Sequence, residues 1–206
     1  MPATVSAPPL FAHLGSPWRI ADLLGTPGTV CEGHFRLLGG AHSDRFVRFS
    51  ELAKDPAALG YVADLLANQV AAWQPSAVIA PCTAGVALGV EISRRLSVRL
   101  YLASVGADGR PDGIIGAPPA PASTLLMVND IVTTGDGLRE LARVVQCAGA
   151  VATGAAAFMA RRAEVDENTV GLPLALVASV PLTSWTADEC PLCQDDTSLT
   201  DGRDLN

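Results

Sequence analysis

Two polar residues and a short glycine-containing turn follow an apolar run in the middle of the chain. Asn129 and Asp130 come directly after Leu125–Val128, and the turn spans residues 133–137, Thr-Thr-Gly-Asp-Gly. The turn offers two hydroxyl donors, and its glycines allow the backbone to approach a ligand closely. At the start of a helix, free N–H groups and the helix dipole favour a bound anion. The residue types and their order therefore predict a phosphate-binding turn beside a polar pair.

The segments on either side of this turn have the patterns of a strand and a helix. Leu125–Val128 carries no charge on either face, which is typical of a buried parallel strand. After the turn, apolar residues recur on one face of a predicted helix, at Leu138, Leu141, Val144 and Val145. Strand, turn and helix in this order form a phosphate-binding layout. The alternative is an ordinary strand, turn and helix of an α/β protein with another ligand.

A second turn of small residues has the same setting. The apolar run Ala77–Ala80 is followed by residues 83–85, Thr-Ala-Gly, and then by a helical pattern over residues 86–96. Free N–H groups at the start of that helix make this turn a second candidate anion site. In open α/β sheets, ligands bind at the carboxyl ends of the strands. Both turns are therefore expected at the same edge of one sheet.

The remaining elements predict the fold class. Asp55 and Pro56 are a good helix start, and apolar runs near residues 98–103, 149–159 and 172–179 alternate with helical patterns. This order predicts a twisted, mostly parallel α/β sheet flanked by helices. Near the N-terminus, Gly39-Gly40 between two strand-like runs predicts a hairpin.

Two segments have weaker patterns. Residues 104–123 are rich in Gly and Pro, and such a long connection favours a mobile lid or disorder. Arg110 is the only cation in it. Arg161 and Arg162 follow a predicted strand on the ligand side, and we interpret them as a solvated charge pair.

Composition limits the possible partners and the location. The chain has 206 residues, a net charge of −7 and only 17% charged residues, so a nucleic-acid partner is not expected. We find no apolar run of membrane-spanning length and no signal-peptide pattern, which predicts a cytoplasmic protein without a membrane partner. Five cysteines, an odd number, do not form the framework of a secreted protein.

Residues 125–137 resemble the phosphoribosyl pyrophosphate (PRPP) signature of the type I phosphoribosyltransferases. Residues 33–46, with Gly-His-Phe and then His-Ser-Asp-Arg-Phe, resemble the N-terminal hood of the orotate phosphoribosyltransferase-like group. The resemblance implies the type I fold with a small hood. It implies an enzyme of nucleotide metabolism, a pentosyltransferase that moves 5-phosphoribosyl from PRPP to an aromatic or heteroaromatic base and releases pyrophosphate. It also implies Mg²⁺ with PRPP, and a homodimer in which each lid reaches the neighbour's site.

The resemblance also assigns roles to residues and limits to domains. It implies catalytic roles for Asp130, Asn129 and Arg110. The hood would meet the acceptor base through Phe35, Leu38, Gly39, Gly40 and His42. PRPP would be bound by Thr83, Ala84, Gly85, Ile131, Val132, Thr133, Thr134, Gly135, Asp136 and Gly137. We expect a loose arm over residues 1–17 and one phosphoribosyltransferase domain over 18–195. That domain has a hood over 18–50, a core over 51–180 and a Cys-containing segment over 181–195, before a tail over 196–206.

Several positions depart from the pattern of this group. Asn129 replaces an acidic residue, Ser104 stands where the lid usually opens with Lys, and Asp136 adds a carboxylate to the phosphate turn. The alternative function is therefore a non-catalytic sensor or regulator that binds PRPP or a nucleotide. The hood turn has small residues where longer donors are usual, and a buried carboxylate without a partner is costly. We accordingly predict that a base other than orotate is the preferred acceptor.

Cys190 and Cys193 form the only close pair of cysteines, and the pair also resembles one near the C-terminus of the orotate phosphoribosyltransferase-like group. Two thiols at this spacing could bind Zn²⁺, but a tetrahedral site needs two more ligands. Cys31 and His34 are the candidates for those ligands, although nothing in the sequence brings them close to the pair. A zinc site at Cys190 and Cys193 is therefore an open possibility.

Overall fold

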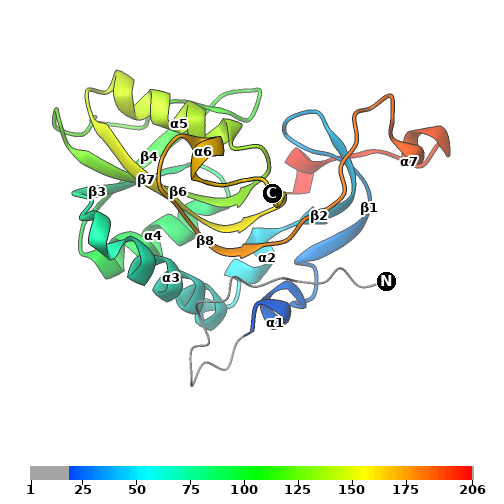
Figure 1. Cartoon of the computed structure of the whole chain (residues 1–206), viewed down its shortest axis with the longest axis horizontal. Coiled ribbons are helices and arrows are strands. Elements are labelled where there is room, and N and C mark those ends of the chain that lie inside the picture. Colours follow the sequence, from blue (N-terminus) through cyan, green and yellow to red (C-terminus); the bar gives the residue numbers. More distant parts are fainter. Residues whose placement is uncertain (1–18, 206) are drawn as a thin grey trace.

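The computed structural model describes residues 19–205, and the arm expected over residues 1–17 lies outside them. A large sheet with helices on both faces forms the core, and a small three-stranded sheet forms the hood beside it (Figure 1). The large sheet has the strand order β5-β4-β3-β6-β7-β8. All neighbouring strands are parallel except β4 and β5, as the sequence predicts for a mostly parallel sheet. The strands are β3 (Ala77–Pro81), β4 (Arg99–Val105), β5 (Pro111–Ile114), β6 (Thr124–Val132), β7 (Val151–Ala160) and β8 (Leu174–Ser179).

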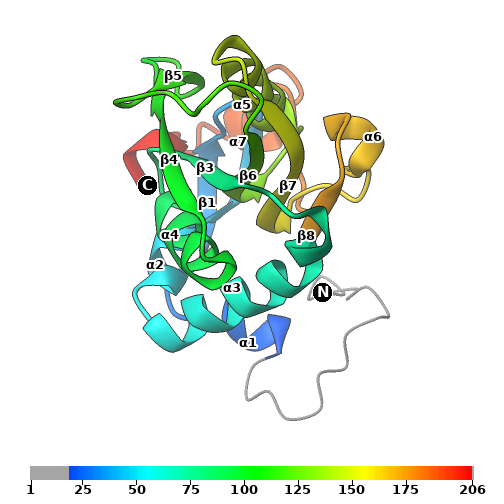
Figure 2. The same cartoon turned by 90° about the vertical axis from the view of Figure 1, so that its left-hand side faces the viewer.

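Helices cover both faces of this sheet (Figure 2). One face carries α3 (Pro56–Val70) and α4 (Gly85–Leu96), and the other carries α5 (Asp136–Cys147). Asp55 caps α3, because its carboxylate accepts hydrogen bonds from the N–H groups of Ala57 and Ala58. Shorter helical segments are α1 (Ile20–Leu24), α2 (Phe49–Ala53), η1 (Ala71–Trp73), α6 (Glu167–Val170), α7 (Pro191–Gln194) and η2 (Gly202–Leu205). Within residues 19–205, no helix is long and apolar enough to cross a membrane.

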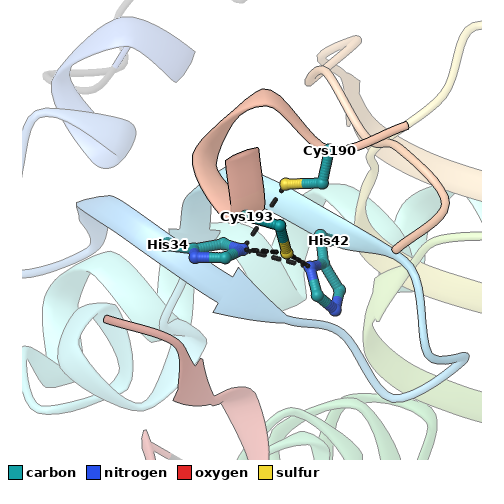
Figure 3. A group of neighbouring side chains, drawn as sticks. All are labelled: His34, His42, Cys190 and Cys193. Carbon is teal, nitrogen blue, oxygen red and sulfur yellow. Dashed lines mark hydrogen bonds between the residues drawn. The ribbon is translucent and has the colours of Figure 1, made fainter. Parts of the chain in front are cut away.

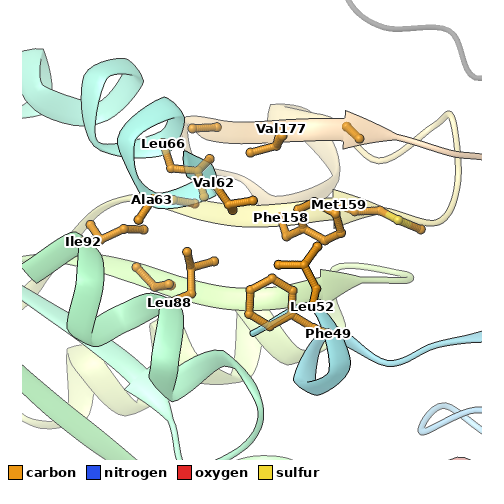
Figure 4. Close-up of a cluster of buried hydrophobic side chains, with 14 of the residues drawn as sticks. Phe49, Leu52, Val62, Ala63, Leu66, Leu88, Ile92, Phe158, Met159 and Val177 are labelled. Atoms are coloured by element: carbon orange, nitrogen blue, oxygen red, sulfur yellow. The ribbon is translucent and has the colours of Figure 1, made fainter. Parts of the chain in front are cut away.

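The core divides into two layers because strand side chains alternate between the faces. In β6, Leu126 and Val128 face α3 and α4, whereas Leu125 and Met127 face α5. Figure 4 shows the first layer, in which side chains of α3 and α4 interdigitate with those of β7 and β8. Phe49 of α2 packs against Phe158 of β7, with ring centroids 5.4 Å apart, and so joins the layer to the segment that follows the hood.

The hood consists of segments from both ends of the described chain. The predicted hairpin is present, with β1 (Val30–Arg36) antiparallel to β2 (His42–Val47). A third strand, β9 (Thr200–Asp201), pairs in parallel with β1, and the Arg36 guanidinium forms an ion pair with Asp201 at 2.5 Å. The segment 196–206 was expected to be a tail that follows the domain. Residues 200–205 instead belong to the hood, because main-chain pairing and this ion pair fix them there.

Residues 104–123 are also more regular than expected. The chain runs from β4 through a tight turn into β5, which adds an antiparallel edge strand to the large sheet. Pro111 lacks an N–H group, and an edge strand is where this omission costs least. The Ser104 hydroxyl donates a hydrogen bond to the Asp112 carboxylate at 2.6 Å across the two strands. The expected structureless lid is therefore, in its first half, a hairpin.

Candidate active site

A cleft lies at the carboxyl ends of β3 and β6, between the sheet, the hood and the β4–β5 hairpin. It brings together Thr83 of the first turn and the whole second turn, as expected from the strand order. The hood contributes one wall, and the hairpin contributes Arg110. The lining residues include Leu38, Gly39, Thr83, Arg110, Asn129, Asp130, Ile131, Val132, Thr133, Thr134, Gly135, Asp136, Gly137 and Arg161.

The phosphate turn contains an internal support for its extra carboxylate. Gly135 has a φ of +81°, a conformation that glycine adopts without strain, and α5 begins at the next residue. The Thr134 hydroxyl donates to the Asp136 carboxylate at 2.6 Å, and Arg139 forms an ion pair with the same carboxylate. The hydrogen bond from Thr134 and then the charge of Arg139 lower the pKa of Asp136. Arg139 therefore neutralises part of the charge of the Asp136 carboxylate, and the turn can still bind an anion. Arg139 was not predicted as a site residue from the sequence.

The polar pair lies within β6 and not after its end. β6 continues to Val132 because its residues pair with β7, Asn129 opposite Ala157 and Ile131 opposite Met159. Burial raises the pKa of Asp130, and hydrogen bonds from backbone N–H groups oppose this only in part. The carboxylate is thus held in a poorly solvated position, as expected for a group that acts on a bound substrate.

Gly85 packs directly against this pair from the first turn. A Cβ atom at Gly85 would lie 3.1 Å from the Asp130 nitrogen and 3.3 Å from the Asn129 Oδ1 atom. Glycine is therefore needed for the start of α4 to lie this close to the polar pair. Thr83 lines the cleft, whereas Ala84 and Gly85, which were expected to contact PRPP, are not among the lining residues.

The β4–β5 hairpin and the tip of the hood meet over the cleft. Gly109 has a φ of +79°, and the Leu38 side chain occupies the space where a Cβ atom would lie. Arg110 follows Gly109, lines the cleft, and its charge contributes to the lowered pKa of Asp136. The hairpin therefore brings its only cation to the cleft of its own chain.

Only part of the hood prediction is met. Leu38 and Gly39 line the cleft, and sequence analysis missed their neighbours Leu37, Ala41, Phe46 and Val47. Phe35 packs inside the hood against Phe46, with ring centroids 5.7 Å apart. Gly40 is exposed and is not among the lining residues. His42 is buried in a separate cluster, described below.

Arg161 is the main residue that sequence analysis assigned wrongly. It is only 3% exposed and lines the cleft, whereas Arg162 is exposed. Its Nη2 atom donates to the Ser43 hydroxyl at 2.9 Å and to the Arg45 carbonyl at 2.8 Å. Burial lowers the pKa of Arg161 to about 10, although the charge of Asp44 opposes this. Arg161 is therefore a buried cation at pH 7 and not part of a solvated pair.

The cysteine pair belongs to a second cluster, on the hood (Figure 3). The ligand atoms of His34, His42, Cys190 and Cys193 all lie within 4.8 Å of one another. Cys31, which was a candidate partner of the pair, lies apart, and its thiol donates to the Gly28 carbonyl. His42 replaces it because His42 and His34 lie on paired strands of the hairpin.

No family model matches the chain, but similar proteins are numerous. An orotate phosphoribosyltransferase from Heliobacterium modesticaldum is 30% identical over 188 residues, which are 87% of this chain and 93% of the relative. The chain belongs to the type I phosphoribosyltransferases, in the orotate phosphoribosyltransferase-like group. An orotate phosphoribosyltransferase from Thermus thermophilus is 29% identical over 182 residues, 87% of this chain and 97% of the relative. The crystal structure of orotate phosphoribosyltransferase from Aeropyrum pernix superposes with a TM-score of 0.66 at 26% identity, covering 78% of this chain and 94% of that one.

Family membership confirms the type I fold and the reaction class predicted from residues 125–137. This phosphoribosyltransferase is a PRPP-dependent glycosyltransferase that transfers phosphoribosyl to a base. The alternative of a non-catalytic sensor has no support among these relatives.

Proposed function

We propose that the acceptor is an aromatic base with a carboxylate substituent, and that orotate is the first candidate. The observation that carries this proposal is the buried cation Arg161 in the wall of the cleft. The relatives from Heliobacterium modesticaldum and Thermus thermophilus are named for orotate, which supports the same choice.

Our prediction that orotate is not the preferred acceptor depended on a shortage of cations. It counted Arg110 as the only cation of residues 104–123, found no long donors in the hood turn, and took Arg161 to be solvated. Within the described chain, the Nε and Nη1 atoms of Arg161 have no hydrogen-bond partner, so they are free to bind a carboxylate. A buried carboxylate is costly only while it lacks such a partner. The ground for rejecting orotate is thereby removed.

PRPP would lie along the two turns. The backbone N–H groups at the start of α5, from Thr133 to Gly137, would bind the 5′-phosphate, with Arg139 limiting the charge of Asp136. Asn129 and Asp130 would hold the ribose hydroxyls, and Thr83 would meet the pyrophosphate from the facing turn. This arrangement puts the anomeric carbon between the sheet and the hood, where the base enters.

The chemistry suits these residue types. Departure of pyrophosphate leaves a ribosyl group with oxocarbenium character, which needs positioning and charge stabilisation more than a covalent intermediate. The Asp130 carboxylate would stabilise positive charge on the ribosyl group from a poorly solvated position. Arg110 would stabilise the departing anion in place of the lid Lys that Ser104 replaces.

Mg²⁺ is the expected companion of PRPP. Asp130 and Asn129 offer the carboxylate and amide oxygens that suit this ion, and Mg²⁺ needs few protein ligands when substrate phosphates supply the rest. When bound, the ion would neutralise part of the pyrophosphate charge.

A homodimer and a cytoplasmic location also stay predictions. Arg110 reaches the cleft of its own chain, so a partner subunit is not needed to supply this cation. A dimer would instead be expected to restrict the movement of the β4–β5 hairpin when PRPP enters.

The test is a measurement of pyrophosphate release from PRPP and Mg²⁺ with orotate, uracil and other aromatic bases. Uracil is the informative control because it has the same ring without the carboxylate. We expect kcat/KM for orotate to exceed that for uracil by at least about tenfold, the value of one hydrogen bond to a charged group. Equal turnover of both bases, or a preference for uracil, would contradict the proposed acceptor.

A further inference from the structure

Three segments that are far apart in the sequence bring two imidazoles and two thiols together on the hood. His34 comes from β1 and His42 from β2, whereas Cys190 directly precedes α7 and Cys193 lies within it (Figure 3). His34, His42 and Cys190 are buried, and Cys193 is partly buried. A polar cluster this deep requires that its groups satisfy one another or bind a ligand in common.

The separations between the ligand atoms fit a single tetrahedral metal. The Nε2 atom of His34 lies 3.0 Å from the Nδ1 atom of His42, 3.4 Å from the Cys190 sulfur and 3.6 Å from the Cys193 sulfur. The Cys193 sulfur lies 3.2 Å from the Nδ1 atom of His42. Zinc bonds to nitrogen and sulfur imply ligand separations of about 3.3–3.8 Å in a tetrahedron. These four separations are therefore within a few tenths of an ångström of that range, and the other two, from Cys190 to Cys193 and to His42, are no longer than 4.8 Å.

The surroundings prepare His34 to be a ligand. Its Nδ1 atom lies 2.8 Å from the Thr197 carbonyl, which can only accept a hydrogen bond. Nδ1 therefore carries the proton, and Nε2 presents its lone pair to the cluster. A hydrogen bond from the outer ring nitrogen to a carbonyl is the usual support of a metal-bound histidine.

The cysteines are also prepared by local structure. Pro191 at the start of α7 fixes the turn, and the N–H of Cys193 donates to the Cys190 carbonyl at 3.2 Å. This turn aims both thiols to the same side. Two cysteines separated by two residues are a common half of a structural zinc site, and two histidines complete the set.

We infer that His34, His42, Cys190 and Cys193 bind one zinc ion, which fixes the C-terminal segment to the hood hairpin. All four positions are protein ligands, which is typical of a structural and not a catalytic zinc. The ion acts on the cleft only through the hairpin, because β1 leads directly to Leu37 and Leu38 in the cleft wall. Its removal should therefore weaken binding of the base more than binding of PRPP.

The test begins with metal content. The full chain is produced without a histidine tag, and its zinc content is measured by elemental mass spectrometry. We expect about one zinc per chain, less than a tenth of this in Cys193→Ser, and an unchanged value in Cys147→Ser, the matched control at an exposed cysteine on α5. Replacement by Co²⁺ should give the visible absorption of a tetrahedral site with a sulfur-to-metal band.

A second measurement applies to the wild-type chain and so does not depend on whether a variant folds. Chelation should lower the melting temperature by at least ~5 °C, and added Zn²⁺ should restore it, because an ion that binds only the folded state stabilises that state. The inference is overturned if the purified chain contains no metal and Zn²⁺ leaves the melting temperature unchanged. It is also overturned if Cys190 and Cys193 are joined by a disulfide, or if Cys147→Ser loses as much zinc as Cys193→Ser.

Discussion

Replacement of Arg161 by Gln should weaken recognition of the acceptor base while leaving the stability of the fold nearly unchanged. Burial lowers the pKa of Arg161 from its usual value to about 10, which corresponds to a cost of about 3 kcal/mol for the charged form. Gln removes this cost but also loses the bonds to the Ser43 hydroxyl and the Arg45 carbonyl, at about 1.5 kcal/mol each for a charged donor. The two effects nearly cancel, and we expect the melting temperature to change by less than ~5 °C.

Recognition of the base should change much more. A hydrogen bond to a charged group contributes about 1.5–3 kcal/mol, so kcat/KM for orotate should fall about 10- to 150-fold in Arg161→Gln. The value for uracil should change by less than about threefold, because uracil has no carboxylate for the guanidinium to bind. Steady-state kinetics with both bases at saturating PRPP measures this ratio. Arg162→Gln is the matched control, since the neighbouring side chain is exposed and should leave both values unchanged.

The pH dependence gives an independent check. Arg161 is charged below its pKa of about 10, so binding of a carboxylate is present at neutral pH and is lost as the pH rises through that value. KM for orotate should be flat from pH 7 to about 9 and then increase, whereas KM for uracil should not follow the same curve. Equal losses for orotate and uracil in Arg161→Gln would refute the reasoning, because they would mean that Arg161 supports only the shape of the cleft.

Three further predictions concern PRPP and assembly. Thr134→Val should weaken PRPP binding by about 1–3 kcal/mol, because it removes a hydroxyl donor and leaves the Asp136 carboxylate without that partner. Unchanged affinity by calorimetry would contradict the assignment of residues 133–137 as the 5′-phosphate site. Gly85→Ala should lower kcat/KM for PRPP at least about tenfold, because the added methyl group would displace Asn129. Gly137→Ala is the control and should keep most of the activity, because a Cβ atom there meets nothing within 4 Å. Equal losses in the two variants would mean that the packing of Gly85 against Asn129 does not limit PRPP turnover. Light scattering at micromolar concentration should give the mass of a homodimer, and a monomer would contradict the expected assembly.

Much of the fold could be predicted because the hydrophobic pattern of the sequence determines where most of its strands and helices lie. β6 is apolar on both faces, and such a strand can only lie in the middle of a covered sheet. Its end was predicted too early, since Asn129 is polar and yet still pairs with β7, and the strand continues through Asp130 to Val132. β5 was missed because Gly and Pro dominate its surroundings, and because an edge strand with one partner needs little apolar surface.

The candidate site was predictable where it depends on local sequence. The phosphate turn and Thr83 are contiguous motifs, and strand order alone brings them to one cleft. Arg161 depends on contacts with Ser43 and Arg45, more than a hundred residues away, and alternation along the sequence cannot reveal them. His42 faces the cysteines for the same reason, because only the register of the β1–β2 hairpin decides which face it joins.

The pairing of β9 with β1 has a consequence for the order in which the protein matures. Arg36 and Asp201 are 165 residues apart in the chain, so the hood sheet closes a very long loop, whereas β3 to β8 assemble from neighbouring segments. On refolding, the core can therefore form before β9 reaches the hood. The hood wall of the cleft acquires this support only when Thr200 and Asp201 pair with β1. A partly folded chain would therefore be able to bind PRPP before it can hold a base, and the transfer reaction would start only after the hood sheet has closed.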